Sequence, residues 1–114
     1  MKKILVVDDD EFIRDSLVCI LRRADFQADG ASGGMSAVDK YKREKSDCVL
    51  LDVDLPDISG IKVFELIREF DPDACVYFLS GSGEFRDQVL AMGARGFFPK
   101  PVEFDKFLAV LKAI

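Results

Sequence analysis

The sequence predicts an α/β fold, a doubly wound five-stranded parallel sheet flanked by five helices. Short continuous apolar runs, typical of buried strands, alternate with apolar residues spaced three or four apart, typical of one helix face. Right-handed crossovers between parallel strands place the connecting helices on both faces of such a sheet. The continuous rather than alternating character of the central runs agrees with this, because parallel strands are buried on both sides.

The first half of the chain contains three predicted strands and two predicted helices. The strands are Lys3–Val7, Phe26–Asp29 and Cys48–Leu51. The apolar stripe of the first helix consists of Ile13, Leu17, Ile20, Leu21 and Ala24, and that of the second consists of Ala37, Val38 and Tyr41. Ser32-Gly33-Gly34 is a turn or cap before the second helix.

The second half repeats the alternation, with strands predicted at Cys75–Leu79 and Arg95–Phe98. The three helical stripes are Val63, Phe64, Ile67 and Phe70; then Phe85, Val89 and Met92; then Phe104, Phe107, Leu108 and Leu111. The breaks between elements are rich in proline and glycine: Pro56–Gly60, Asp71-Pro72-Asp73, Ser80-Gly81-Ser82-Gly83 and Pro99-Lys100-Pro101.

From length and composition we expect one globular domain covering residues 1–114, and no output domain within this chain. The hydrophobic content of 49% and charged content of 32% are ordinary for such a domain. A net charge of -5 argues against direct binding of nucleic acid, which needs a basic surface. A signal-peptide apolar region and a run long enough to span a membrane are both missing, so we expect a cytoplasmic protein without membrane contact.

Cys19, Cys48 and Cys75 all lie in apolar segments. Their odd number, the absence of histidine and the absence of a CxxC spacing argue against disulfides and against a zinc site. We therefore expect three reduced thiols that act as small core residues.

Polar side chains follow four of the predicted strands, where the apolar runs end. Asp8 and Asp9 follow the first strand, Asp52 the third and Ser80 the fourth, and Lys100 comes just after the fifth. In open parallel sheets, ligands bind outside the carboxyl ends of the strands, where the winding reverses. We therefore expect these side chains to meet at one rim.

Three carboxylates at one rim need a compensating cation. Asp8, Asp9 and Asp52 would repel one another, and a hard divalent ion such as Mg²⁺ would relieve this by binding one or two carboxylates, waters and a phosphate oxygen. Alternatively, the acids at 8–11 are those of a helix N-terminus, where the helix dipole favours negative charge. That interpretation suits Asp10 and Glu11, but Asp8 and Asp9 directly continue the strand.

Asp52 is a candidate nucleophile that would attack phosphorus and form an acyl phosphate. Lys100, between two prolines that fix its loop, is a candidate for holding the phosphoryl oxygens, although lysines are more often surface residues. Ser80 offers a hydroxyl to the same group, or is simply a turn serine. The glycines near Ser80 do not form a P-loop, because the GxxxxGK[ST] spacing is missing.

Four segments together resemble the receiver domain of two-component response regulators. They are VVDDDEFIR, LLDVDLPDISG, FLSGSG and GARGFFPKP, in that order and with suitable helices between them. The resemblance covers nearly the whole chain. It implies a flavodoxin-like strand order 2-1-3-4-5 and a phosphorylation-dependent signalling switch without small-molecule turnover.

The resemblance also implies a role for each matched residue. Asp52 would accept phosphate from a sensor histidine kinase, a phosphotransfer protein or a small acyl-phosphate donor. Asp8, Asp9 and Asp52 would hold Mg²⁺, or Mn²⁺ as a substitute, with the backbone carbonyl of Asp54 (rather than that of Val53) completing the site.

Lys100 would pair with the phosphoryl group, and the bond from Lys100 to Pro101 would be cis. Ser80 would move toward the phosphoryl group while Phe97 swings inward. The face formed by the fourth helix, fifth strand and fifth helix would then change its affinity for an effector protein or for an output domain of a longer chain.

The sequence departs from the family pattern at four positions. Gly81 replaces an alanine, Phe97 lacks the hydroxyl of a frequent tyrosine, Asp54 adds an acid near the site, and Pro99 stiffens the approach to Lys100. We expect these departures to affect the rates of phosphorylation and dephosphorylation. Every residue that the chemistry requires is still present.

Two other functions compete with the switch. Asp52-Val53-Asp54 resembles the DxD of haloacid-dehalogenase-type phosphatases, in which the second acid is a general acid, although the chain is short for that family's cap. A docking module that works without phosphorylation is the other alternative, against which the intact Asp9, Asp52 and Lys100 argue.

Overall fold

The structure of the protein is a computed structural model that describes residues 2–114. Its strands are β1 Lys3–Val7, β2 Gln27–Ala31, β3 Cys48–Asp52, β4 Val76–Ser80 and β5 Gly96–Pro99. Its helices are α1 Glu11–Arg23, α2 Gly34–Arg43, α3 Gly60–Phe70, α4 Arg86–Ala91 and α5 Phe104–Lys112. Within these residues, no helix is both long and apolar enough to cross a membrane.

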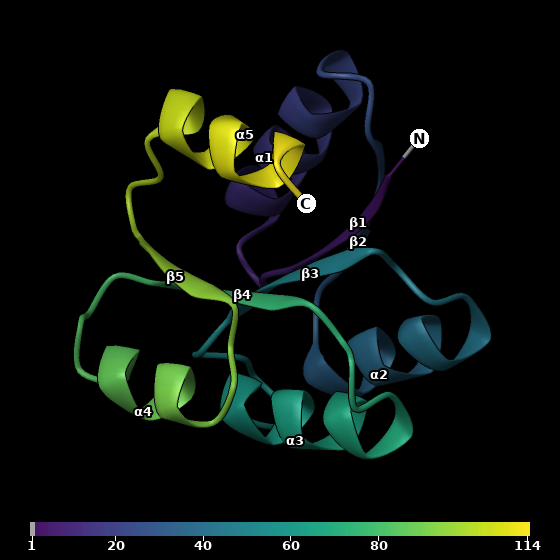
Figure 1. Ribbon diagram of the computed structural model, residues 1–114, viewed down its shortest axis with the longest axis vertical. Helices are drawn as coiled ribbons and strands as arrows, with labels where there is room; N and C mark the ends of the chain where they lie inside the picture. Colours follow the sequence, from purple (N-terminus) through teal and green to yellow (C-terminus); the bar gives the residue numbers. More distant parts are fainter. Residues whose placement is uncertain (1) are drawn as a thin grey trace.

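The five strands form one parallel sheet in the order β2-β1-β3-β4-β5. Helices α1 and α5 lie on one face of the sheet, and α2, α3 and α4 lie on the other (Figure 1). The predicted fold class and strand order are therefore confirmed. The chain moves outward from β1 to β2, and then crosses back to β3 on the other side of β1. This reversal places the carboxyl ends of β1 and β3 next to each other, where α/β sheets bind ligands.

Each sheet face has its own apolar core. Alternate residues of the central strands supply both cores, because successive side chains of a strand point to opposite faces. The core under α2, α3 and α4 includes Val7, Leu51, Val63, Phe64 and Phe78. The core under α1 and α5 includes Ile4, Leu17, Leu50, Phe107 and Leu111.

Burial of these side chains, at about 25 cal/mol for each Å² of apolar surface removed from water, is the main force that holds the helices on the sheet.

Most element positions agree with the sequence prediction, and the differences lie at the ends. The second strand runs from Gln27 to Ala31 rather than over Phe26–Asp29, because Gly30 and Ala31 continue the pairing with β1. The fourth and fifth strands likewise start one residue later than predicted and end one later. Asp10 is the N-cap of α1, and its carboxylate accepts a hydrogen bond from the Ile13 amide at 3.1 Å.

One prediction about the cysteines is wrong. All three thiols are free, and Cys48 is buried as expected, but Cys19 is exposed on α1 and Cys75 is partly exposed. Cys19 follows the buried-side residues Leu17 and Val18 around the helix, so a position within an apolar run does not place it in the core.

Candidate functional site

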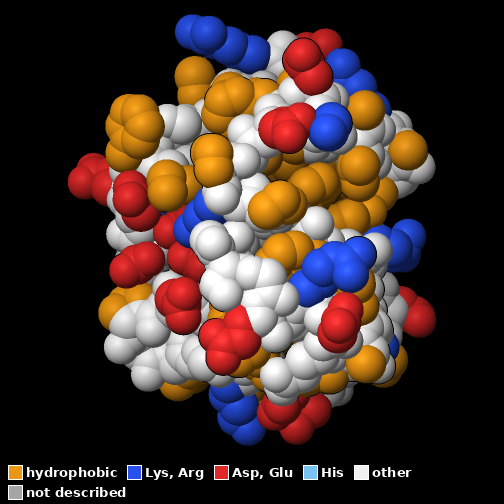
Figure 2. All heavy atoms as spheres, turned by 90° about the vertical axis from the view of Figure 1, so that its left-hand side faces the viewer, with side chains coloured by type: hydrophobic (Ala, Val, Ile, Leu, Met, Phe, Trp, Pro, Cys, Tyr) orange, Lys and Arg blue, Asp and Glu red, His pale blue; other side chains and the backbone are white. Residues whose placement is uncertain are grey.

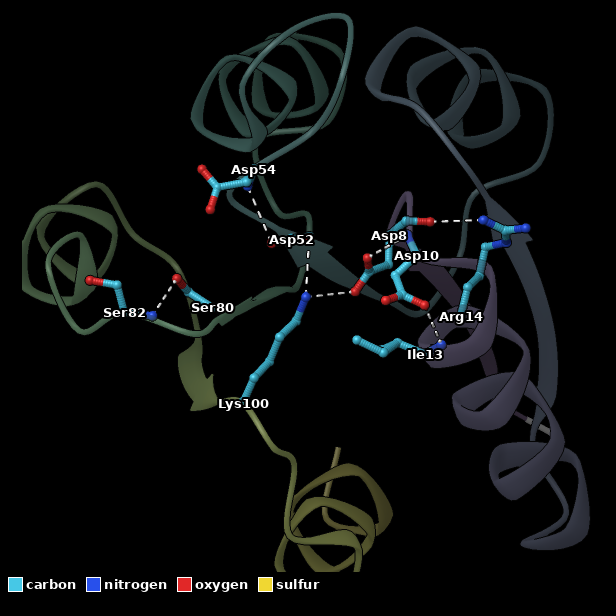
Figure 3. Close-up of polar contacts among 9 residues, drawn as sticks. All are labelled: Asp8, Asp10, Ile13, Arg14, Asp52, Asp54, Ser80, Ser82 and Lys100. Atoms are coloured by element: carbon cyan, nitrogen blue, oxygen red, sulfur yellow. Dashed lines mark hydrogen bonds and ion pairs between the residues drawn. The ribbon is translucent and has the colours of Figure 1, made fainter.

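Lys100 joins the carboxyl ends of β1 and β3. Its ammonium Nζ lies 2.8 Å from Oδ2 of Asp8 and 3.1 Å from Oδ2 of Asp52. Asp8 is fully buried and the Asp52 side chain is only 6% exposed, whereas the Lys100 side chain is 20% exposed. Figure 3 shows the lysine reaching from the end of β5 across the sheet rim to both acids. The rim therefore holds two buried carboxylates with one shared positive charge.

Asp9 adds a third carboxylate to this rim. One carboxylate oxygen from each of Asp8, Asp9 and Asp52 lies within 4.8 Å of the others, and Asp9 is exposed to solvent. An all-oxygen donor set with an open side is what Mg²⁺ prefers, because this ion keeps several waters and binds few carboxylates. The residues present therefore fit a magnesium ion.

Backbone groups orient the two buried carboxylates. The amide of Asp10 donates to Oδ1 of Asp8 at 3.0 Å, and the amide of Asp54 donates to Oδ1 of Asp52 at 3.2 Å. The Arg14 guanidinium donates to the backbone carbonyl of Asp8 at 2.9 Å and ties the end of β1 to α1 (Figure 3). Each buried acid is thus held by one backbone amide and by Lys100, which leaves its geometry well defined.

Burial and the charge of Asp8 raise the pKa of Asp52 from 3.8 to about 6, although Lys100 and the Asp54 amide act in the opposite direction. Burial alone would lower the pKa of Lys100, but its hydrogen bonds to Asp8 and Asp52 raise it above the ordinary value. The two shifts have the same physical origin, since burial opposes charge on both groups while the contact between Lys100 and Asp52 favours it.

Ser80 and Phe97 lie on the neighbouring strands β4 and β5, Ser80 at the carboxyl end of its strand. The Ser80 side chain is buried at the end of β4, and its Oγ accepts a hydrogen bond from the Ser82 amide at 3.1 Å (Figure 3). Phe97 pairs with Phe78 in the register of β4 and β5, and it is partly buried against the core under α2, α3 and α4.

Asp54 has its amide in the site and its carboxylate outside it. The residue is exposed, and its carboxylate is turned away from Lys100 and Asp8 (Figure 3). This orientation does not suit the general acid of a phosphatase. The peptide bond between Lys100 and Pro101 is cis, and the Lys100 amide donates to the Ser80 carbonyl at 2.8 Å, which continues the pairing of β5 with β4 past Pro99.

A profile of the response regulator receiver domain matches residues 4–112. The chain belongs to the response regulator receiver domain family. Members of this family act in two-component signalling and are phosphorylated on an aspartate. The receiver domain is 33% identical to the chemotaxis protein CheY of Thermotoga maritima, over 99% of this chain and 97% of that protein. It is also 35% identical to the transcriptional regulatory protein YxdJ of Bacillus subtilis, where the match covers 99% of this chain and 50% of YxdJ.

Solved structures of receivers resemble this one closely. The response regulator TrrA of Thermotoga maritima, crystallised in complex with Mg(2+)-BeF, superposes with a TM-score of 0.91 at 33% identity, covering 99% of this chain and 98% of TrrA. CheY in a CheX–CheY–BeF3–Mg complex from Borrelia burgdorferi superposes with a TM-score of 0.92 at 33% identity, covering 98% and 87% of the two chains.

Three residues that shape the receiver site were not singled out from the sequence. Arg14 binds the Asp8 carbonyl, as described above. Asp57 accepts hydrogen bonds from the amides of Gly34 and Met35, at 2.8 and 2.9 Å, and so ties the loop after β3 to the start of α2. Gly60 leaves no room for a side chain, because a Cβ there would lie 2.1 Å from the Asp52 carbonyl oxygen. Only Gly60 had a signal in the sequence, as the glycine of the Pro-x-x-x-Gly loop.

Proposed function

We propose that this receiver domain is a phosphorylation-dependent switch in which Asp52 accepts the phosphoryl group. The donor would be a sensor histidine kinase, a phosphotransfer protein or a small acyl phosphate, with no turnover of a small-molecule substrate. The observation that carries the proposal is the Asp52 carboxylate itself, buried at the rim and 3.1 Å from the Lys100 ammonium.

The reaction that this geometry supports is a displacement at phosphorus. An Oδ atom of Asp52 attacks phosphorus, the bond from phosphorus to the donor atom breaks, and the donor leaves with the electron pair. Lys100 neutralises the phosphoryl oxygens, since its ammonium already lies against Asp52. The Ser80 hydroxyl accepts from the Ser82 amide and keeps its own proton for donation to a phosphoryl oxygen.

The carboxylates of Asp8, Asp9 and Asp52 would hold Mg²⁺, or Mn²⁺ in its place, together with the backbone carbonyl of Asp54. A bound ion supplies positive charge that stabilises the oxygens of the transferring group. The complex of TrrA with Mg(2+)-BeF, a receiver at 33% identity to this chain, supports this assignment.

The output surface in this proposal is the face made by α4, β5 and α5. Figure 2 looks onto that side of the molecule and shows hydrophobic side chains over its upper half, where α5 lies. Phe104 and Val110 of α5 are 44% and 37% exposed, and Phe97 of β5 is partly buried. Movement of Ser80 toward a phosphoryl group would free space for Phe97 and change this face, which an effector protein or an output domain would bind.

The test is uptake of phosphate from acetyl phosphate with Mg²⁺, followed by intact-mass spectrometry. We expect one phosphoryl group on the wild-type protein, none without a divalent ion, and none on Asp52→Asn. Asp73→Asn, which removes an exposed acid in the turn before β4, is the matched control and should behave as wild type. Uptake that survives Asp52→Asn would refute the assignment of the acceptor.

A further inference from the structure

Two cysteines lie side by side at the amino ends of β3 and β4, the ends of these strands that are farther from Asp52. Cys48 is the first residue of β3, and Cys75 directly precedes β4. Val49 pairs with Val76 in the register of these strands, so the two cysteines form the preceding pair. The Val49 amide donates to the Cys75 carbonyl at 2.9 Å, which holds the two backbones together at this point.

Both thiols also lie on the same sheet face. Cys48 belongs to the core under α1 and α5, and Cys75 packs against that same core. Adjacent strands lie about 4.8 Å apart, and disulfides form between residues whose Cα atoms are about 4.4–6.8 Å apart. The bond from the Val49 amide to the Cys75 carbonyl keeps the two backbones adjacent, so the cysteine side chains are what must turn to bring the sulfurs together.

We propose that Cys48 and Cys75 form an intramolecular disulfide when the folded protein reacts with a peroxide, so that the amino ends of β3 and β4 are a thiol oxidation site. The proposal goes beyond the phosphorylation switch and does not depend on it. Every step uses only the two thiols and one peroxide molecule.

The chemistry has two balanced steps. The Cys75 thiolate attacks one peroxide oxygen, the O–O bond breaks, and Cys75 becomes a sulfenic acid while hydroxide leaves and takes up a proton to form water. The Cys48 sulfur then attacks the sulfenic sulfur, and the S–S bond forms as the hydroxyl group leaves with the Cys48 proton as a second water. The two thiols lose two electrons, and the peroxide gains them.

The two cysteines have the unequal properties that this order of events needs. Cys75 is partly exposed, so peroxide can reach it, whereas Cys48 is buried. The neighbouring Cys48 thiol and then the charge of Arg95 lower the pKa of Cys75 from 9.0 to about 7, although burial acts against them. The neighbouring Cys75 sulfur and burial raise the pKa of Cys48, which favours its thiol form.

The experiment uses the folded Cys19→Ser protein, because Cys19 is exposed on α1 and would react on its own. The protein is treated with hydrogen peroxide, denatured, alkylated and digested with trypsin without reduction. We expect peptides 46–62 and 69–86, which contain Cys48 and Cys75, to appear as one species lighter than their sum by two hydrogen atoms. Dithiothreitol should separate them.

Two matched variants in the same background test the order of the steps. Cys48→Ser should stop at a Cys75 sulfenic acid that dimedone traps, and Cys75→Ser should leave Cys48 fully alkylatable after denaturation. The proposal is overturned if both thiols of the Cys19→Ser protein remain alkylatable at a peroxide dose that oxidises Cys19 in the wild type. It is also overturned if Cys75 accumulates as the dimedone adduct while Cys48 stays free.

Discussion

Replacing Lys100 by methionine should destabilise the metal-free protein strongly. Methionine keeps the unbranched shape of the lysine stem and removes the ammonium that lies 2.8 Å from Asp8 and 3.1 Å from Asp52. Two buried carboxylates then face each other without a cation. Removing one partner of a buried ion pair costs about 3–5 kcal/mol, and we expect a loss in that range from a total unfolding free energy of about 5–15 kcal/mol.

Urea unfolding in EDTA, followed by circular dichroism at neutral pH, measures this loss. The effect should shrink at about pH 5, because Asp52, whose pKa is about 6 in the wild type, takes up a proton there. Added Mg²⁺ should restore part of the stability, because the proposed ion site exists only in the folded state.

Lys42→Met is the matched control, because Lys42 is exposed on α2, and we expect a change within about 0.5 kcal/mol. An unfolding free energy for Lys100→Met equal to that of the control would mean that the two acids do not share a buried site.

Three further predictions concern the same rim and the loops beside it. Because the pKa of Asp52 is raised to about 6, the free energy of unfolding of the metal-free protein should fall by about 2 kcal/mol as pH rises from about 4 to about 6. Urea titrations of Asp52→Asn should not show this decline. Asp57 has its pKa lowered to about 2 by the amides at the start of α2, so Asp57→Asn should lower the melting temperature at neutral pH, with the difference lost as pH falls from about 4 to about 2. Gly60→Ala should lower the free energy of unfolding by about 2 kcal/mol or more, because its Cβ would meet the Asp52 carbonyl. Gly81→Ala, with no atom within 4 Å of its Cβ, should leave the free energy of unfolding unchanged in the same assay.

The sheet and the rim were predictable from sequence because both follow from simple patterns. Buried parallel strands appear as continuous apolar runs, and the residue after each run must lie at the carboxyl edge. That reasoning is enough to bring Asp8, Asp52 and Lys100 together, and the structure places the lysine ammonium within 3.1 Å of both acids.

The contacts that support the rim were harder to predict from the sequence. Arg14 acts through its long side chain on a backbone carbonyl, and Asp57 acts on amides of a helix that begins 23 residues earlier. Neither position differs in sequence from an ordinary surface charge, because the partner in each case is a backbone group. The exposure of Cys19 was mispredicted for a related reason, since the direction in which a helix position faces depends on where the helix packs.

The loop that follows Asp52 after β3 and the loop that follows Ser80 after β4 differ in how firmly they are held. After β3, the Gly60 amide donates to the Val53 carbonyl at 2.8 Å, and Asp57 fastens the same loop to α2. After β4, Gly81 and Gly83 have open space around them, and α4 beyond is a helix of six residues. The loop after β3 is therefore fastened to its surroundings, whereas the loop after β4 has open space beside its glycines. We therefore expect phosphorylation to move the loop after β4 and the start of α4 more than the loop after β3, which Asp57 ties to α2.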